Sequence, residues 1–322
     1  MNTNPMTGGQ DPGYVMGRTS GEYERLRRQS ELLDSITVTV LDRVGLGFGM
    51  QCLDVGCGPG EVMRLMAERV GPTGRVVGID LDGKLGSEAL SVLTSKGYRQ
   101  CSFIEGGVES LEQIASDPFD LVFARLLLMD LDDPVLGLRR MYSRVRPGGR
   151  IVIQDYYFPT MDSYPTVEPL AEFKKVFLAV FDKMGRETRM GIKLPGFFIE
   201  AGIGAPDGTD VTGFLQPIRL AAEMATAIYR SVLPLALKHG VTTEERSEWF
   251  FEEIRKVREC EYYVLSPLLV SAWRQKPVDQ SRCQCHRLGA SEIIDRLCLA
   301  LRFWSERQSS AEEQTNSYLL LE

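Results

Sequence analysis

A glycine-rich turn directly after an apolar stretch constrains the fold of this chain more than any other feature. Residues 53–60 read LDVGCGPG, and residues 76–80 read VVGID and end on Asp80. Glycines allow a sharp turn and let a ligand approach the main chain closely. A carboxylate at the end of the next strand can accept hydrogen bonds from both hydroxyls of a ribose. Together the two segments predict a nucleotide-binding crevice.

Strands and helices alternate along the first half of the chain. The expected strands cover residues 51–55, 75–80, 100–105, 119–124 and 150–156, with helices expected at 20–45, 61–70, 84–96 and 134–145. A turn signal, RPGG, separates the last of these helices from the last strand. Alternation at this spacing predicts an α/β fold with a doubly wound, mainly parallel, seven-stranded Rossmann-like sheet. The last two strands are expected at residues 209–215 and 265–273.

Composition excludes several classes of function. The chain has 322 residues, a formal charge of −7 and a pI near 5.2, so it lacks the basic surface that binds nucleic acid or an anionic membrane. Seven scattered cysteines do not form a disulfide framework, and a cytoplasmic location is expected because neither a signal peptide nor a membrane span is apparent. Cys283, Cys285 and His286 lack a nearby fourth ligand, so no metal site is predicted.

With these motifs in order, the chain resembles the class I S-adenosylmethionine-dependent methyltransferases. The resemblance is strongest over residues 50–160 and also includes residues 118–124 (PFDLVFA) and 145–149 (VRPGG). Residues 13–18, 22–26, 191–195 and 206–211 are similar to an actinobacterial subgroup that acts on small molecules. This resemblance implies a small secondary-metabolite or quinone-like acceptor, methylated on carbon, nitrogen or oxygen.

The resemblance also implies how S-adenosylmethionine is bound. Asp54 would orient the glycine turn, Asp80 would hold the ribose, Leu81 would flank the adenine, and Ala124 and Arg125 would present main-chain carbonyls to the ammonium group. The glycine turn would line the methionine part, the loop at residues 107–109 would meet the adenine edge, and two tyrosines would belong to an N-terminal cover. The implied cofactor-binding residues are Tyr14, Tyr23, Asp54, Gly56, Gly58, Gly60, Asp80, Leu81, Gly107, Val108, Ala124 and Arg125.

Candidate catalytic residues lie at the carboxyl ends of strands four and five, where ligands of open α/β sheets bind. They are Asp130, Asp155 and Tyr157, with Tyr156 beside them. Asp130 stands where the resemblance implies a histidine, so an inherited histidine mechanism is not expected. A base is needed only if the acceptor carries a proton, and each of these residues can instead have a structural role, such as capping a turn.

The resemblance divides the chain into three parts. Residues 1–48 form a cofactor-covering segment, residues 49–277 the methyltransferase domain, and residues 278–322 a helical appendage whose apolar stripe suits packing on the chain itself or on a second subunit. A helical insertion at residues 218–260, between the last two strands, is expected to form an apolar and aromatic lid over the acceptor. The expected partner is a small molecule, with a homodimer as a further possibility.

Two other functions share these features. An NAD-dependent dehydrogenase also uses a glycine turn and an acidic residue on the second strand, but Glu61 stands where its fingerprint requires a third glycine. A methyltransferase fold can also bind the cofactor without methyl transfer, as a regulator or a cyclase-type catalyst, with the same crevice. Methyl transfer is the leading prediction.

Overall fold

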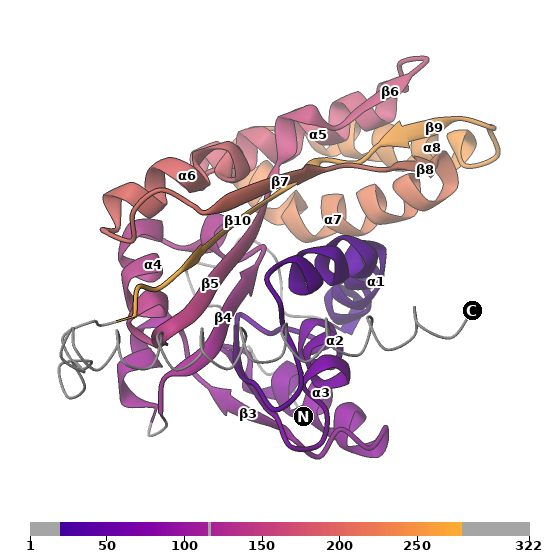
Figure 1. The fold of residues 1–322 in the computed structure, drawn as a ribbon. Coiled ribbons are helices and arrows are strands. Elements are labelled where there is room, and N and C mark those ends of the chain that lie inside the picture. The colour runs from indigo at the N-terminus through magenta and orange to yellow at the C-terminus, as the bar shows by residue number, and fades with distance from the viewer. Residues whose placement is uncertain (1–19, 115–116, 279–322) are drawn as a thin grey trace, which may run out of the picture. The chain divides into compact units, whose positions relative to one another are not determined.

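One large sheet with helices on both faces organises the computed structural model, which describes residues 20–114 and 117–278 (Figure 1). Its strands hydrogen-bond in the order β3-β2-β1-β4-β5-β10-β7. They are β1 (Gln51–Val55), β2 (Arg75–Asp80), β3 (Cys101–Glu105), β4 (Phe119–Arg125), β5 (Val145–Tyr157), β7 (Gly208–Thr212) and β10 (Leu268–Gln275). Strands β1 to β5 pair in parallel with one another, whereas β10 is antiparallel to both β5 and β7. The predicted seven-stranded, mainly parallel sheet is confirmed.

Side chains from the strands enter two hydrophobic layers. The helices of the described residues are α1 (Ser20–Arg43), α2 (Glu61–Val70), α3 (Gly83–Ser95), α4 (Pro134–Ser143), α5 (Glu168–Lys183), α6 (Met190–Glu200), α7 (Ile218–Lys238) and α8 (Glu244–Val257). Cys52 of β1 packs in the layer that contains α2 and the end of α1, whereas Leu53 and Val55 pack in the layer that contains α4 and α6. Strands buried on both faces are typical of a parallel sheet covered by helices on both sides.

A second, smaller sheet, which the sequence analysis does not predict, forms in the other half of the chain. Strands β6 (Asp162–Tyr164), β9 (Tyr263–Leu265) and β8 (Leu215–Pro217) pair antiparallel in the order β6-β9-β8. Each has only three residues, which is too short for a period-2 pattern to stand out. The predicted turn lies within the span of β5. Residues 146–149 are unpaired with β4 there, because the register moves from Val145 opposite Phe119 to Arg150 opposite Leu121, and Gly148 has a φ angle of 80°.

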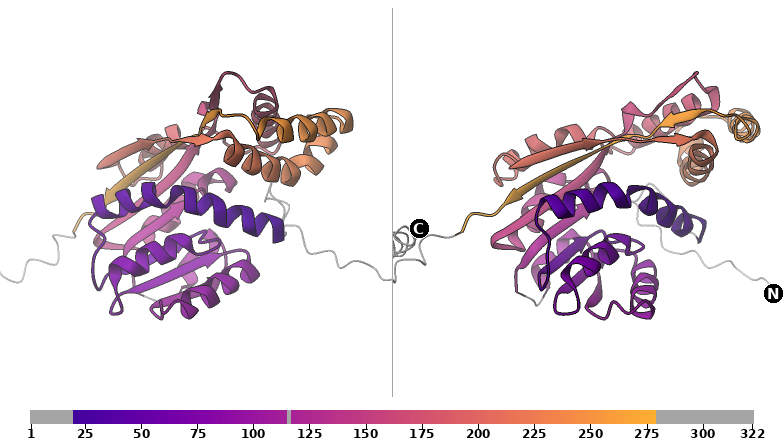
Figure 2. Two further views of the ribbon diagram at one scale, coloured as in Figure 1. Left: turned by 90° about the vertical axis from the view of Figure 1, so that its right-hand side faces the viewer. Right: turned by 45° about the vertical axis from the view of Figure 1, so that its right-hand side comes forward.

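Helices α7 and α8 lie between β7 and β10 in the sequence, as predicted for the insertion at residues 218–260. The structure does not confirm the predicted lid. Figure 2 shows α1 lying between α7 and α2. Many apolar side chains of the insertion, such as Tyr229, Val232 and Phe250, are buried in the core. By length and composition alone, α7 could cross a membrane, but a core helix passes the same test and α7 packs against α5, α1 and α8.

Some predictions concern residues that lie outside the described part of the chain. Tyr14, the cysteine and histidine group at residues 283–286, and nearly all of the appendage at residues 278–322 belong to this set. Within the described residues, no cluster of His, Cys, Asp and Glu could hold a metal ion.

Gly78 in β2 provides a test of the packing between β2 and the glycine turn. A Cβ at this position would lie about 2.8 Å from Cys57 Sγ and still closer to the Met63 side chain. We expect Gly78→Ala to lower the free energy of unfolding by about 1–3 kcal/mol, because overpacking forces neighbouring side chains off their rotamers. Urea denaturation followed by circular dichroism measures this change.

Gly196 in α6 is the matched control. It is exposed, and a Cβ there would meet nothing within 4 Å. Gly196→Ala should leave the stability unchanged or raise it by up to about 1 kcal/mol, because alanine is the better helix former. Equal effects of the two substitutions would mean that the contact between β2 and the turn is not tightly packed.

Candidate functional site

A cavity of about 630 Å³ opens at the carboxyl ends of β1, β2 and β4, beneath α1. Ten of the predicted site residues line it, namely Tyr23, Asp54, Gly56, Gly58, Asp80, Leu81, Gly107, Val108, Arg125 and Asp130. Gly60, Ala124, Asp155 and Tyr157 are absent from its wall. The structure therefore brings together most residues of the predicted crevice, although they come from segments that are far apart in the sequence.

The glycine turn forms one wall because it is tied to the end of β2. The N–H groups of Gly56 and Cys57 both donate to the carbonyl of Ile79, at 2.8 and 3.1 Å. Gly56 and Gly58 have positive φ angles of 72° and 48°, a conformation that disfavours residues with a Cβ. At Gly58 a Cβ would face open space, so only the backbone requires a glycine there.

Gly60 has a different role from the one predicted. It precedes α2 in the left-handed conformation with φ 80°, and a Cβ there would lie 3.0 Å from the Cβ of Ala89 in α3. Gly60 therefore allows close packing of α2 and α3 instead of lining the cavity.

Asp80 links the turn to the cavity. Its carboxylate accepts hydrogen bonds from the N–H of Gly58 at 2.8 Å and of Asp82 at 2.9 Å. Tyr23 on α1 donates its hydroxyl proton to Asp82 at 2.6 Å, which fastens α1 over this end of the sheet. The predicted position of Tyr23 in the cover of the crevice agrees with this arrangement.

Asp54, near the end of β1 and directly before the turn, is a buried carboxylate with an incomplete set of hydrogen bonds within the described residues. It is 1% exposed, and its Oδ2 has no hydrogen-bond partner in the described part of the chain. Burial raises the pKa of Asp54 to about 7, against the attraction of Arg125. No hydrogen bond joins its carboxylate to the described amides of the turn, so the predicted orienting role is not observed. A buried carboxylate oxygen without a partner instead suits a cationic ligand group, such as the ammonium of S-adenosylmethionine.

Arg125 connects the cavity to α1. Its guanidinium group donates to the hydroxyls of Thr37 and Ser30, each at 2.8 Å. Thr37 in turn donates to the side chain of Gln154 on β5 at 2.8 Å. The pKa of Arg125 is lowered by burial, which Asp54 opposes. Arg125 therefore holds the cover by its side chain, in addition to the predicted main-chain role.

Of the three predicted catalytic residues, only Asp130 lines the cavity. It ends the short 3-10 helix η2 (Leu128–Asp130), and its Oδ1 is buried without a hydrogen-bond partner among the described residues. Burial raises the pKa of Asp130 to about 7, while Arg186 and Arg25 lower it.

The other two candidates, Asp155 and Tyr157, do not line the cavity and make hydrogen bonds within the fold. Asp155 is fully buried, and its carboxylate accepts from the N–H groups of Tyr156 at 2.9 Å and Met129 at 3.3 Å. Burial raises the pKa of Asp155 to about 8. The carbonyl of Tyr157 accepts from the hydroxyl of Thr160, outside the cavity wall. The geometry does not support a catalytic role for Asp155 or Tyr157.

Two ion pairs in the cavity wall were not predicted from the sequence. Glu22 and Arg25 on α1 are 3% and 6% exposed, and Arg25 donates to both carboxylate oxygens of Glu22, at 2.9 and 2.6 Å. Arg186, which follows α5, is also buried and pairs with exposed Asp132 at 2.8 Å. The sequence shows that Glu22 and Arg25 are three residues apart, but ion pairs with this spacing usually lie on exposed helix surfaces, so the spacing did not indicate a cavity wall.

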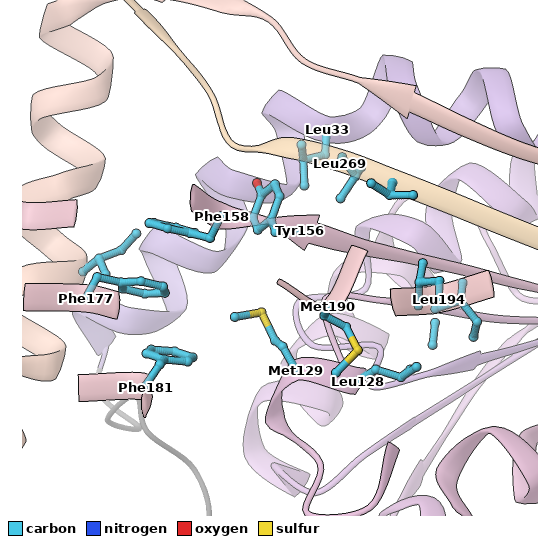
Figure 3. Close-up of a cluster of buried hydrophobic side chains, with 14 of the residues drawn as sticks. Leu33, Leu128, Met129, Tyr156, Phe158, Phe177, Phe181, Met190, Leu194 and Leu269 are labelled. Atoms are coloured by element: carbon cyan, nitrogen blue, oxygen red, sulfur yellow. The ribbon is translucent and has the colours of Figure 1, made fainter. Parts of the chain in front are cut away.

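Aromatic rings line another part of the same cavity, and Figure 3 shows Tyr156, Phe158, Phe177 and Phe181 close together. The ring of Phe177 stacks between those of Phe158 and Phe181, with centroid distances of 4.0 and 4.2 Å, and Tyr156 meets Phe158 edge to face at 6.4 Å. All four rings line the cavity. The four-residue spacing from Phe177 to Phe181 in α5 is the sequence feature that could have indicated this aromatic wall. The sequence instead predicts a pocket formed by the insertion at residues 218–260, of which only Ile228 lines the cavity.

Comparison with known proteins agrees with this geometry. Residues 47–187 match the model of a family described as a methyltransferase domain. An uncharacterised 37.1 kDa protein of a Streptomyces fradiae transposon is 26% identical, over 66% of this chain and 63% of that protein. The 2-phytyl-1,4-naphtoquinone methyltransferase of Thermosynechococcus vestitus is 31% identical, over 43% of this chain and 57% of that enzyme. The chain thus spans less than two thirds of the length of these relatives.

Among solved structures, that of a proposed methyltransferase from Bacillus halodurans is similar to this chain. The TM-score is 0.51 at 16% identity, and the match covers 76% of this chain and all of the other. At this identity, the similarity concerns the fold alone.

Asp80 provides a direct test of the cofactor end of the cavity. We expect Asp80→Asn to raise the Kd for S-adenosylmethionine about 10- to 100-fold, because a hydrogen bond to a charged group contributes about 1.5–3 kcal/mol. Isothermal titration calorimetry measures this Kd. Glu105→Gln is the matched control, since Glu105 is the register partner of Asp80 on β3 but is exposed and does not line the cavity. Equal Kd values for both variants would contradict the role of Asp80.

Asp54 makes the binding of S-adenosylmethionine depend on pH. Because burial raises the pKa of Asp54 to about 7, the folded protein holds this group protonated below that pH, and a neutral carboxyl attracts an ammonium group less strongly. Affinity should therefore rise between about pH 6 and about pH 7.5. In Asp54→Asn, calorimetry should find weaker binding with a flatter pH dependence. An unchanged dependence would assign the titration to another group.

Proposed function

Residues 47–187 form a class I S-adenosylmethionine-dependent methyltransferase domain, and from this premise we propose that the protein transfers a methyl group to a small apolar or aromatic acceptor. One observation carries the proposal: a single cavity holds both the glycine turn with Asp80 and the aromatic wall. A cofactor and an acceptor bound there would be adjacent, which an in-line displacement requires. The acceptor lies within secondary metabolism in this proposal, as the resemblance of residues 13–18 implies.

The residues of the cofactor end fit S-adenosylmethionine. Asp80 would hold the ribose, Leu81 and Val108 would enclose the adenine, and Asp54 would attract the ammonium group. Bound there, S-adenosylmethionine would supply a methyl group activated by the positive charge on sulfur. The chain then has to position the acceptor and exclude water, because such a displacement needs little further chemical assistance.

The acceptor end suits a flat, apolar molecule. Phe158, Phe177 and Phe181 present ring faces and edges, and Met129 lies beside them (Figure 3). The relative from T. vestitus is named for a naphthoquinone, which has a flat bicyclic ring. A bicyclic aromatic acceptor is therefore the first class to test.

The proposal also includes a small-molecule acceptor as the partner, no binding of nucleic acid, and a cytoplasmic location. The net charge of −7 supports the exclusion of nucleic acid, because phosphate backbones bind basic surfaces. Light scattering of the full chain would determine whether the protein forms a homodimer.

Two measurements test the proposed function. Calorimetry should detect binding of S-adenosylmethionine and none of NADH, which separates methyl transfer from dehydrogenase chemistry. An assay for S-adenosylhomocysteine with a panel of aromatic, amine and thiol acceptors should then detect turnover with an aromatic acceptor. Cofactor binding without turnover on any acceptor would favour the alternative, a methyltransferase fold used as a regulator or a cyclase-type catalyst.

Phe177 tests the aromatic wall. We expect Phe177→Leu to raise the KM for an aromatic acceptor about 10-fold, because a stacked ring pair contributes about 0.5–1.5 kcal/mol beyond its buried area. The Kd for S-adenosylmethionine should not change. Phe250→Leu is the matched control, because Phe250 is also buried in a stacked pair, with Tyr229 at 3.9 Å, but does not line the cavity. A similar rise in KM for both variants would indicate a general loss of packing.

A further inference from the structure

Asp130 leaves one hydrogen-bonding position in the cavity wall unused. Its Oδ1 is buried and has no partner in the part of the chain that the structure describes. A buried carboxylate oxygen without a donor is costly, so a ligand that brings a donor to this position gains affinity. The acceptor end of the cavity therefore combines an apolar ring wall with charged groups that are already paired, and Asp130 Oδ1 is a buried acceptor there without a partner among the described residues.

The charges around Asp130 favour a hydroxyl over an amine as this donor. Arg25 on α1 and Arg186 after α5 act on Asp130 as positive charges, and Glu22 on α1 acts as a negative charge. Glu22 is already held by Arg25 in a two-fold hydrogen bond and by the hydroxyl of Ser231 at 3.0 Å. Asp155 lies behind, on β5, and does not line the cavity. Arg25 is paired with Glu22, and Arg186 is paired with Asp132, which also lines the cavity. Both arginines still lower the pKa of Asp130, against Glu22, so positive charge predominates among the groups that act on it. This charge disfavours a protonated amine and stabilises an oxygen that becomes negative.

The ring wall determines the body of the molecule that carries the hydroxyl. The stacked rings of Phe158, Phe177 and Phe181 and the edge of Tyr156 line the same cavity as Asp130. Aromatic rings pack well against offset or perpendicular rings. A planar aromatic body with one hydroxyl group fits both the wall and the carboxylate.

We propose that the acceptor is an aromatic alcohol of the phenol or naphthol class, and that Asp130 is the catalytic residue that takes its hydroxyl proton. This inference rests on the proposed function and adds the substrate class and the base. The proton moves from the hydroxyl to Asp130 Oδ1, and the electron pair left on the oxygen forms a bond to the methyl carbon. The bond between that carbon and the sulfonium sulfur breaks, and its electron pair stays on sulfur. The products are a methyl ether, neutral S-adenosylhomocysteine and a protonated Asp130, which then releases its proton to solvent.

The first experiment measures binding of probes to the full chain in the presence of S-adenosylhomocysteine. Calorimetry compares 1-naphthol with 1-methoxynaphthalene, which has the same rings but no hydroxyl proton. The wild-type protein should bind 1-naphthol about 10-fold more tightly or better, the effect of one hydrogen bond to a charged group. Asp130→Leu should remove this preference while keeping the affinity for S-adenosylhomocysteine, which shows that the variant is folded.

The second experiment measures turnover by Asp130→Asn with two naphthols of different acidity. We expect kcat with 1-naphthol to fall about 100-fold, the usual contribution of a general base. With 4-nitro-1-naphthol, which ionises without a base, the loss should be below about 3-fold. Wild-type turnover of 1-naphthol should rise as the pH passes about 7, because Asp130 must be a carboxylate to accept the proton, and the variant should lack this rise. Asp162→Asn, an exposed carboxylate on β6, is the control.

Each outcome separates this inference from the proposed function. If the wild-type protein shows no preference for 1-naphthol over its methyl ether, the inference is wrong, even where an amine or a thiol yields S-adenosylhomocysteine and the proposed function stands. A clear preference without turnover on any acceptor would support the hydroxyl site and contradict methyl transfer. An equal loss of kcat with both naphthols would exclude Asp130 as the base.

Discussion

The hydrogen bonds between the glycine turn and the end of β2 are the contact on which the site depends. Gly56 and Cys57 share the carbonyl of Ile79, and Gly58 donates to Asp80. These bonds require the left-handed backbone that glycine adopts without strain. They place Asp54, the turn and Asp80 around one cavity, with the N-terminal end of α2 directly behind it. Without this contact, the two carboxylates would lie on adjacent strands without a common ligand position.

The cover of the cavity depends on a second set of polar contacts, made by α1. Tyr23 binds Asp82 near the start of the helix, and Arg125 and Gln154 bind Thr37 further along it. Because these groups are buried or partly buried, each bond is stronger than it would be in water. The same helix carries Glu22 and Arg25 into the cavity wall. One element thus fixes the cover and supplies charge to the acceptor end.

The sequence predicted the cofactor end far better than the acceptor end. The glycine turn and Asp80 lie in short contiguous motifs, so their spacing indicates a common ligand, and the resemblance adds Leu81. The acceptor end combines α1, η2, β5 and α5, and no local pattern connects Arg25 with Arg186 or Asp130 with Phe177. The position of the helical insertion at residues 218–260 between two strands predicts a lid, and its aromatic residues predict an apolar pocket, but Tyr229 and Phe250 stack on each other in the core. Aromatic content cannot distinguish a cavity wall from packed helices.

The sequence by itself therefore determined the large sheet and the turn, since these follow from backbone rules that act over a few residues, and the order of its motifs carried the resemblance that implies the cofactor class. Only the tertiary structure decided which of the candidate acids faces the cavity. Asp130 follows β4, Asp155 lies near the end of β5, and both have a raised pKa. The carboxylate of Asp155 accepts from the amides of Tyr156 and Met129, whereas Asp130 keeps one oxygen without a partner in the described chain. The direction of a side chain at the end of a strand depends on the elements packed around it, and those elements come from distant parts of the sequence.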